Sequence, residues 1–344
     1  MEVVLYRKRL FRLLGLIVFI TSIGGGWLWM AYQQFLQRPL AVELPAEKQI
    51  LFTIAPGRSL SWVAAQLEAK GYITNRHFFR LLAQWQDQGS AIKAGEYDLT
   101  AAMRPQEILQ RFVSGHPYQH SITIIEGWRF SEVRAQLASA TLLEQQLPAI
   151  SDSALMQQLG SEYPHPEGLF LPETYQFSAG SSDLALLQRA YQQLQQQLQR
   201  LWAARPAETL LKTPYEALIL ASIIEKESGI EAERPVIAGV FTRRLKLQMR
   251  LQTDPTVIYG VGEDFDGNLT RAHLQQDTPY NSYTRAGLPP TPIALVGRAA
   301  IAAAISPAPG DALYFVSKGD GSHHFSATLE EHNRAVNRYQ RRSQ

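Results

Sequence analysis

The sequence predicts an α+β protein with one N-terminal transmembrane helix, a small β-α-α-β module and a larger mixed α+β domain. Three observations carry this prediction: a long apolar run without charge near the N-terminus, a strand-turn-helix pattern that occurs twice, and an apolar helix that ends in two glutamates. The first indicates a membrane segment, the second a modular organisation, and the third a candidate site for chemistry.

Length and composition limit the classes of protein to which the chain can belong. The chain has 344 residues, enough for two domains, and its 45% hydrophobic and 19% charged residues are typical of a folded globular protein. A formal net charge of +2 gives no argument for a nucleic-acid partner, which needs a concentrated basic face. Because the chain has no cysteine, disulfides, a thiolate nucleophile and cysteine-ligated metal sites are excluded.

The N-terminal run predicts a membrane anchor. Residues 13–37 carry no charge, and the apolar centre at 13–33 has the roughly 20 residues that a helix needs to cross a bilayer. The tail at 1–12 is basic, so we expect it in the cytoplasm and the rest of the chain outside. The alternative is a cleaved signal peptide, but no small-x-small cleavage site follows the apolar run.

A repeat follows the predicted linker at 34–48. Residues 51–69 align without a gap on residues 121–139, with a constant offset of 70 and eight identities. Each copy predicts a short strand, a turn at Gly57 or Gly127, and an amphipathic helix that a serine near the turn can cap.

The first copy extends into a module at residues 49–118. Further helices are predicted at 77–85 and 105–113, with a strand at 95–99 between them. This order resembles the LysM-like module, a carbohydrate-binding fold of cell-wall proteins; the alternative is a spacer without a ligand. The larger domain is expected at 119–344, and the strand at 121–125 either pairs within it or belongs to a second LysM-like copy.

Residues 215–230 are the strongest candidate for chemistry. The stretch from 217 to 224 is apolar except for one serine, which predicts a buried helix, with Gly229 suited to its C-terminal cap. Glu227 continues the apolar stripe of this helix, and apolar surroundings raise the pKa of a carboxyl group, as a general acid at neutral pH requires. Glu225 projects to another side. The alternative for either glutamate is a surface charge at a helix end.

Two segments downstream of this helix offer groups suited to sugar recognition. The first, at 251–260, is expected to be a loop because Pro255 disfavours a regular helix at the preceding residue. The second, at 280–290, ends in a rigid Gly-Leu-Pro-Pro turn. The alternative is that both segments are structural connectors. The predicted substrate-binding residues of the two segments are Gln252, Thr253, Asp254, Tyr259, Asn281 and Tyr283.

Several long motifs resemble one family. They are ASIIEKESGI at 221–230, the run from ERPVIAG to DPTVIYG at 233–260, and YNSYTRAGLPPTPI at 280–293. EGLFLPETYQF at 167–177 and HFSATLEEHNRAV at 324–336 extend the similarity over nearly the whole chain. Together these motifs resemble the MltG (YceG-like) family of endolytic murein transglycosylases.

The resemblance implies a site and a mechanism. Glu227 matches the catalytic glutamate of the family, and Ser228 completes a pair similar to the Glu-Ser of lysozyme-like lytic transglycosylases. The glutamic acid would protonate the oxygen between N-acetylmuramic acid and N-acetylglucosamine. It would then take the proton of the muramyl C6 hydroxyl, which attacks C1 and leaves a 1,6-anhydro end. Such a reaction consumes no water and needs no second carboxylate, unlike ordinary glycoside hydrolysis.

The resemblance also implies a setting. We expect an inner-membrane protein with a periplasmic body, no cofactor, and a membrane-bound peptidoglycan synthase as partner in terminating nascent glycan strands. No metal is expected either: His323 and His324 are adjacent, and neighbouring residues of a strand point to opposite faces.

Other functions remain open beside this one. The chain could be a non-catalytic peptidoglycan-binding scaffold of cell-wall synthesis, or a hydrolytic muramidase with Asp254 as the partner carboxylate. A pyridoxal-phosphate lyase is disfavoured, because it needs a Schiff-base lysine and belongs with cytoplasmic metabolites.

Overall fold

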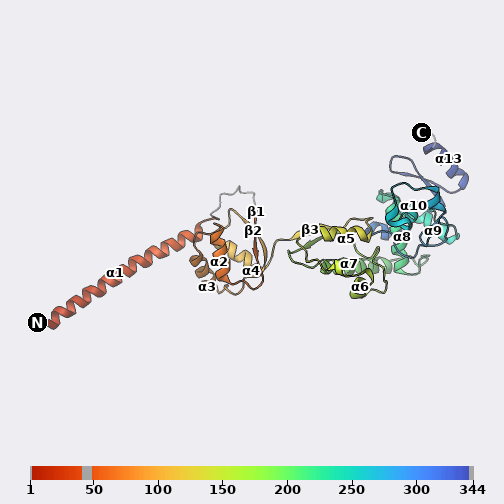
Figure 1. Ribbon diagram of the computed structural model, residues 1–344. Helices are drawn as coiled ribbons and strands as arrows, with labels where there is room; N and C mark the ends of the chain where they lie inside the picture. Colours follow the sequence, from red (N-terminus) through yellow and green to blue (C-terminus); the bar gives the residue numbers. More distant parts are fainter. Residues whose placement is uncertain (1, 41–48, 341–344) are drawn as a thin grey trace. The chain divides into compact units, whose positions relative to one another are not determined.

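The computed structural model describes residues 2–40 and 49–340. The chain divides into two compact units, Met1–His120 and Ser121–Gln344 (Figure 1). Most of the linker predicted at 34–48, namely residues 41–48, lies outside the described residues.

The first helix, α1 (Glu2–Gln37), covers the segment predicted to enter the membrane. Its last turns pack on the rest of the first unit. Tyr32 and Phe35 are buried, and the Tyr32 ring lies edge-on to Trp85 at 5.3 Å between centroids. Over the ranges that the structure describes, no helix is both long enough and apolar enough to pass through a membrane. The membrane anchor therefore stays a prediction, and the side chains of the basic tail lie outside the described ones.

The rest of the first unit is a two-stranded antiparallel sheet covered by helices. Strand β1 pairs with β2 along six residues, with Phe52 opposite Tyr97, and both of these rings are buried with Phe112. The expected order of strand, two helices, strand and helix is confirmed, although the likeness to LysM stays a prediction. The elements are β1 (Gln49–Ile54), α2 (Leu60–Ala69), α3 (Arg76–Trp85), β2 (Gly95–Thr100) and α4 (Pro105–Ser114).

The internal repeat is visible in the backbone. Helix α5 (Phe130–Ser139) has the length of α2 and begins 70 residues later, and Gly57 and Gly127 both turn the chain at φ +77°. The predicted serine cap holds only in the first copy, where Ser59 accepts from the Trp62 N–H. In the second copy the Glu132 carboxylate accepts from the Arg129 N–H at 2.7 Å instead.

The strand of the second copy, β3 (His120–Thr123), pairs with β4 (Thr174–Phe177). It therefore forms a sheet with a segment of the larger domain. The expectation that this strand pairs within the larger domain is confirmed.

The second unit is built around one buried helix, α8 (Pro214–Glu227), as the sequence predicts. Residues from Ala217 to Ile224 are all buried, and α8 packs on α7, α9, α10 and α12. A hairpin of β5 and β6 follows, and α13 packs on both of its strands. The remaining elements are η1 (Leu147–Ala149), α6 (Asp152–Gln158), α7 (Asp183–Ala203), η2 (Glu231–Glu233), α9 (Arg234–Lys246), α10 (Asp254–Val261), η3 (Gly262–Asp264), α11 (Arg271–Gln275), α12 (Arg298–Ile305), β5 (Tyr314–Ser317), β6 (His323–Ser326) and α13 (Leu329–Tyr339).

Two local expectations were wrong. The segment expected to be a loop because of Pro255 contains helix α10, which begins at Asp254. Proline is favoured in the first turn of a helix, where its missing N–H would have no partner, so Pro255 starts this helix rather than preventing it. The C-terminal cap of α8 is Ser228 in extended conformation, not Gly229.

Candidate active site

Glu227 lies at a cavity of about 450 Å³ in the second unit. The walls come from the end of α8, the segment before α10, the β5–β6 hairpin and α13, which are up to about a hundred residues apart in the chain. Of the predicted site residues, the cavity brings together Glu227, Gln252, Thr253, Asp254 and Tyr283. It is further lined by Arg244, Leu251, Tyr314, Phe315, Val316, Ser317, His323, Leu329, His332, Val336 and Gln340.

The Glu227 carboxyl group has the environment of a general acid. Burial raises its pKa, and the nearby negative charge of Asp254 raises it further. The Thr253 hydroxyl donates a hydrogen bond to Oε1 of Glu227, and this bond, like the charges of His323 and Arg244, lowers the pKa in part. The net shift is upward, so Glu227 holds its proton at a higher pH than an exposed glutamate does.

Asp254 is a second carboxyl group at the same cavity, but its surroundings differ. It is exposed at the first position of α10 and accepts a hydrogen bond from the Tyr283 hydroxyl at 2.6 Å. Burial and the Asp254 charge together raise the pKa of Tyr283, so this phenol stays protonated and donates. The pair places an anion and a phenol ring side by side at the wall of the cavity.

Gln252 reaches the cavity from a strained backbone position. Its φ of +51° is in the left-handed region, which residues other than glycine seldom adopt. The backbone is held there because the Gln252 N–H donates to the Ser282 carbonyl at 3.2 Å and the Thr253 N–H to the Ser282 hydroxyl at 3.0 Å. Such strain is concentrated at functional sites.

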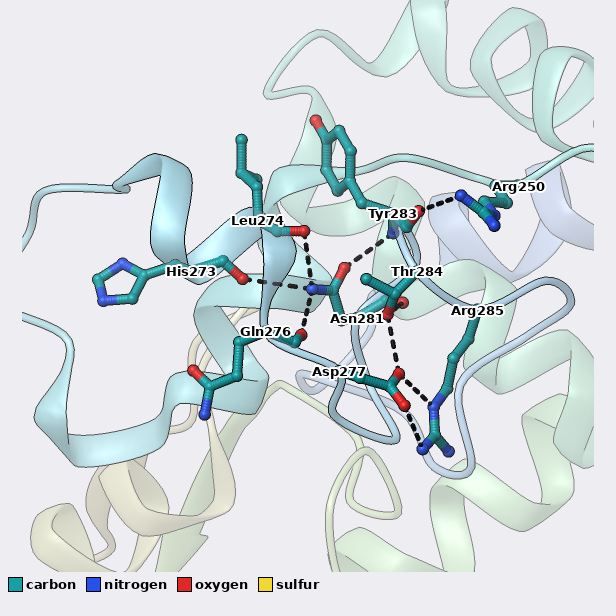
Figure 2. A network of polar contacts seen from close by, with 9 residues as sticks. All are labelled: Arg250, His273, Leu274, Gln276, Asp277, Asn281, Tyr283, Thr284 and Arg285. Carbon is teal, nitrogen blue, oxygen red and sulfur yellow. Dashed lines mark hydrogen bonds and ion pairs between the residues drawn. The ribbon is translucent and has the colours of Figure 1, made fainter.

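Asn281 supports the cavity from behind and does not line it. Figure 2 shows its side-chain amide surrounded by backbone groups. Nδ2 donates to the carbonyls of His273, Leu274 and Gln276 at 3.2, 3.1 and 2.6 Å, and Oδ1 accepts from the Tyr283 N–H at 2.8 Å. With Asn281 only 1% exposed, the arrangement favours a role in positioning Tyr283 over a contact with substrate.

Two more predicted substrate-binding residues lie outside the cavity. The buried Ser228 hydroxyl accepts from the Ile230 N–H at 3.0 Å, which stabilises the chain just after α8. The Tyr259 hydroxyl donates to Oε2 of Glu167 at 3.1 Å. Both side chains therefore have partners inside the protein.

Glu167 was missed as an ionisable group by the sequence analysis, which names its segment only as one of the family motifs. It is 4% exposed and accepts from the Phe130 N–H at 3.0 Å as well as from Tyr259. Burial outweighs these hydrogen bonds and raises the pKa of Glu167 to about 7. Its location in the apolar motif at 167–177 could have signalled a buried carboxyl group.

Glu225 lies on another side of α8, as expected. Oε1 accepts from Nη2 of Arg234 at 2.7 Å, and Oε2 accepts from the Gly297 N–H at 3.0 Å. The carboxylate thus connects α8 with α9 and with the start of α12, which is a structural role.

Arg244 and the cavity residues between positions 314 and 340 were also missed as site residues, because no local pattern joins them to Glu227. Nε of Arg244 donates to the Leu313 carbonyl at 2.6 Å and Nη1 to the Leu251 carbonyl at 2.9 Å, so the Arg244 side chain connects two walls of the cavity.

Within the described part of the chain, no cluster of three or more histidines or carboxylates is arranged to hold a metal ion.

Comparisons with known proteins show to which family the chain is similar. A model of the YceG-like family matches residues 52–338. The endolytic murein transglycosylase of Bacillus subtilis is 32% identical over 334 residues, which cover 92% of this chain and 91% of that protein. The protein of the same name from Streptococcus pneumoniae is 25% identical, and the aligned region covers 93% of this chain but 63% of the pneumococcal protein.

A solved structure is similar as well. The crystal structure of a YceG-like protein from Listeria monocytogenes is 28% identical, with a TM-score of 0.54 over 84% of this chain and 99% of that chain. The family model spans most of the residues on which the fold and the cavity depend. This chain therefore belongs to the YceG-like family.

Proposed function

We propose that the chain is an endolytic murein transglycosylase that cleaves peptidoglycan between N-acetylmuramic acid and N-acetylglucosamine, with Glu227 as the catalytic acid. The observation that carries the proposal is the position of Glu227 at the cavity, where burial raises the pKa of its carboxyl group. The names of the relatives from Bacillus subtilis and Streptococcus pneumoniae support the same reaction.

The surroundings of Glu227 fit the proposed chemistry. A carboxyl group with a raised pKa can give its proton to the leaving glycosidic oxygen at neutral pH. The muramyl C6 hydroxyl then attacks C1, its proton passes to a base, and a 1,6-anhydro ring forms without water. Gln252, Asp254 and Tyr283 offer amide, carboxylate and aromatic groups for the sugars at the cavity.

Mass spectrometry of the cleavage products tests the proposal. The purified full chain and the Glu227→Gln variant are each incubated with uncrosslinked glycan strands. We expect the wild-type protein to release fragments whose ends are lighter by one water, and the variant to release none, because it lacks the acidic proton but has nearly the same volume. Equal rates for the two proteins would refute the assignment of Glu227.

A second candidate function is hydrolysis with Asp254 as partner carboxylate. The observation in its favour is that Asp254 lines the same cavity and is near enough to raise the pKa of Glu227. Two carboxyl groups can activate a water molecule or form a covalent intermediate. Reducing ends among the wild-type products would favour this candidate.

The proposal includes a location. We infer a single membrane anchor within α1, with the N-terminus in the cytoplasm and the body in the periplasm. Residues 13–37 without charge support it, as do exposed apolar side chains on α1, among them Phe19, Ile23 and Trp27. Reaction of single cysteines, introduced on either side of α1 into this cysteine-free chain, with an impermeant reagent tests the orientation.

The first unit and a partner complete the proposal. The β-α-α-β order of residues 49–118 supports a LysM-like module that binds glycan strands. A membrane-bound peptidoglycan synthase would supply the nascent strands, and cleavage would terminate their growth. Deletion of residues 49–118 should weaken glycan binding while the bond that is cleaved stays the same, and cleavage at a new linkage would contradict this division.

A further inference from the structure

His323 and Glu233 form a bonded pair at the cavity. Glu233 ends η2 just after α8, and His323 is the first residue of β6. Oε1 of Glu233 accepts from the His323 backbone N–H at 2.9 Å, and Oε2 lies 2.7 Å from Nδ1 of the ring. The His323 side chain is 11% exposed and that of Glu233 is 15% exposed, so water competes little for these contacts.

The pair fixes which ring nitrogen carries a proton. Burial alone would raise the pKa of Glu233, but hydrogen bonds from the His323 backbone and ring outweigh it and the net shift is downward. An ionised carboxylate only accepts hydrogen bonds, so Nδ1 of His323 must be the donor. In the neutral ring this leaves Nε2 as an acceptor.

The ring with this acceptor lines the same cavity as Glu227. It is near enough for a positive charge on His323 to favour the ionised form of Glu227. Two other charged groups of the cavity are engaged in hydrogen bonds: Arg244 donates to backbone carbonyls, and Asp254 accepts from Tyr283. His332 is the other histidine of the cavity, and its ring stacks on Tyr314 at 5.3 Å between ring centroids. Its buried Nδ1 has no hydrogen-bond partner among the described residues, so no carboxylate orients this ring as Glu233 orients His323.

We propose that His323 is a second catalytic residue and that Glu233 is its positioning residue. In this proposal Nε2 of His323, rather than the ionised Glu227 that the family resemblance implies, accepts the proton of the muramyl C6 hydroxyl. The inference rests on the proposed transglycosylase function. Glu227 gives its proton to the glycosidic oxygen as the bond from that oxygen to C1 breaks. The C6 oxygen bonds to C1, its proton passes to Nε2, and the imidazolium then returns a proton to the Glu227 carboxylate. No water or other reactant is consumed.

The arrangement has the form of an activated base in other enzymes, in which a carboxylate orients the ring that takes the proton. The Ser228 hydroxyl, next to Glu227 in the chain, donates to Oε2 of Glu233 at 3.4 Å. This contact connects the Glu233–His323 pair to the end of α8. The acid and the proposed base are thereby held by the same short segment, 227–233.

The chain offers a matched control for the test. His324 is the next residue of β6, is absent from the cavity, and lies 5.7 Å from the Tyr339 ring between centroids. His323→Asn, His323→Ala and His324→Ala are prepared in the full chain. The rate of formation of 1,6-anhydro ends is measured for each, and glycan affinity is measured by calorimetry with each change added to Glu227→Gln.

We expect His323→Asn and His323→Ala to lower kcat by about 10²-fold or more, a common effect of losing a general base, with affinity within about threefold. Free imidazole should restore part of the activity of His323→Ala, which a purely structural role would not allow. His324→Ala should keep its activity, and Glu233→Gln should lower kcat with little change of affinity.

Two results would overturn the inference: a His323→Asn rate within about threefold of wild type, or a loss fully explained by weaker binding. The failure of the proposed function has a different signature. If only the inference fails, the wild-type protein still forms 1,6-anhydro ends and Glu227→Gln is inactive. If the proposed function fails, those two results are themselves missing.

Discussion

The Thr253 hydroxyl donates a hydrogen bond to Oε1 of Glu227 and thereby joins the end of α8 to the start of α10. Thr253 occupies the N-cap position of α10, where a hydroxyl often accepts from a backbone N–H, but it makes no such bond here. The hydroxyl is therefore available to orient the carboxyl group of Glu227 at the cavity.

Replacement of Thr253 tests how this contact tunes the acid. The hydrogen bond favours the ionised form of Glu227 and so lowers its pKa. Thr253→Val keeps the shape but removes the donor, so the pKa of Glu227 should rise. Because Glu227 must be protonated to act, the alkaline limb of the kcat profile should move to higher pH. Thr253→Ser, which keeps the hydroxyl, should leave the limb in place, and a shift to lower pH in Thr253→Val would contradict the account.

Asp254→Asn distinguishes the one-carboxylate reaction from hydrolysis. The Asp254 charge raises the pKa of Glu227, so its removal should move the alkaline limb to lower pH. The asparagine oxygen can still accept from Tyr283. At a pH below the limb, we expect a loss of kcat of less than about tenfold, since the proposed reaction needs one carboxyl acid. A loss of about 10²-fold or more at every pH would indicate that Asp254 takes part in catalysis.

Asn281→Ala should destabilise the second unit. It would leave three backbone carbonyls and the Tyr283 N–H without their partner, at a site that is 1% exposed. We expect a loss of about 3 kcal/mol in the free energy of unfolding, measured with urea, together with lower activity because Tyr283 is displaced.

The exposed pair of Arg285 and Asp277 in the same network is the control for Asn281. Arg285→Ala should leave the urea midpoint unchanged, because exposed ion pairs contribute little. An unchanged midpoint for Asn281→Ala would show that its amide is not a structural support.

Glu167 should make the stability of the protein depend on pH. Its folded pKa of about 7 lies above the ordinary value of 4.5, so the folded state binds more protons between these values. Stability should be fully present below about pH 4.5 and fall as the pH rises through 7, by about 3 kcal/mol in all.

Glu167→Gln should abolish this part of the dependence while keeping partners for Phe130 and Tyr259. The measurement is urea unfolding of both proteins at pH 5 and pH 8. We expect the free energy of unfolding of the variant, relative to that of the wild type, to be higher at pH 8 than at pH 5. A difference between the two proteins that is the same at both pH values would refute the prediction.

Much of the fold follows from local patterns. The periodicity of α8, the repeat with its two glycine turns and the order of elements in the first unit all depend on residues close in sequence, and all are confirmed. The prediction of a loop at Pro255 was wrong because proline disfavours a helix at the preceding residue except in the first turn of a helix, where Pro255 lies.

The site was harder to predict from the sequence than the fold was. The sequence singled out Glu227 and four other residues of its cavity, but the contributions of Arg244 and His323 depend on how α9 and the β5–β6 hairpin pack, which no spacing in the sequence encodes. Asn281 and Tyr259 have the chemistry of sugar ligands, yet the fold gives their polar atoms partners inside the protein. Residue type alone cannot separate these two uses.

The most direct test of the central claim is cleavage of glycan strands in water enriched in ¹⁸O. In a transglycosylase driven by Glu227 the C6 hydroxyl is the nucleophile, so we predict new 1,6-anhydro ends without ¹⁸O, formed by the wild type and absent with Glu227→Gln. Incorporation of one ¹⁸O atom at each new reducing end would contradict the account and show that the protein is a hydrolase.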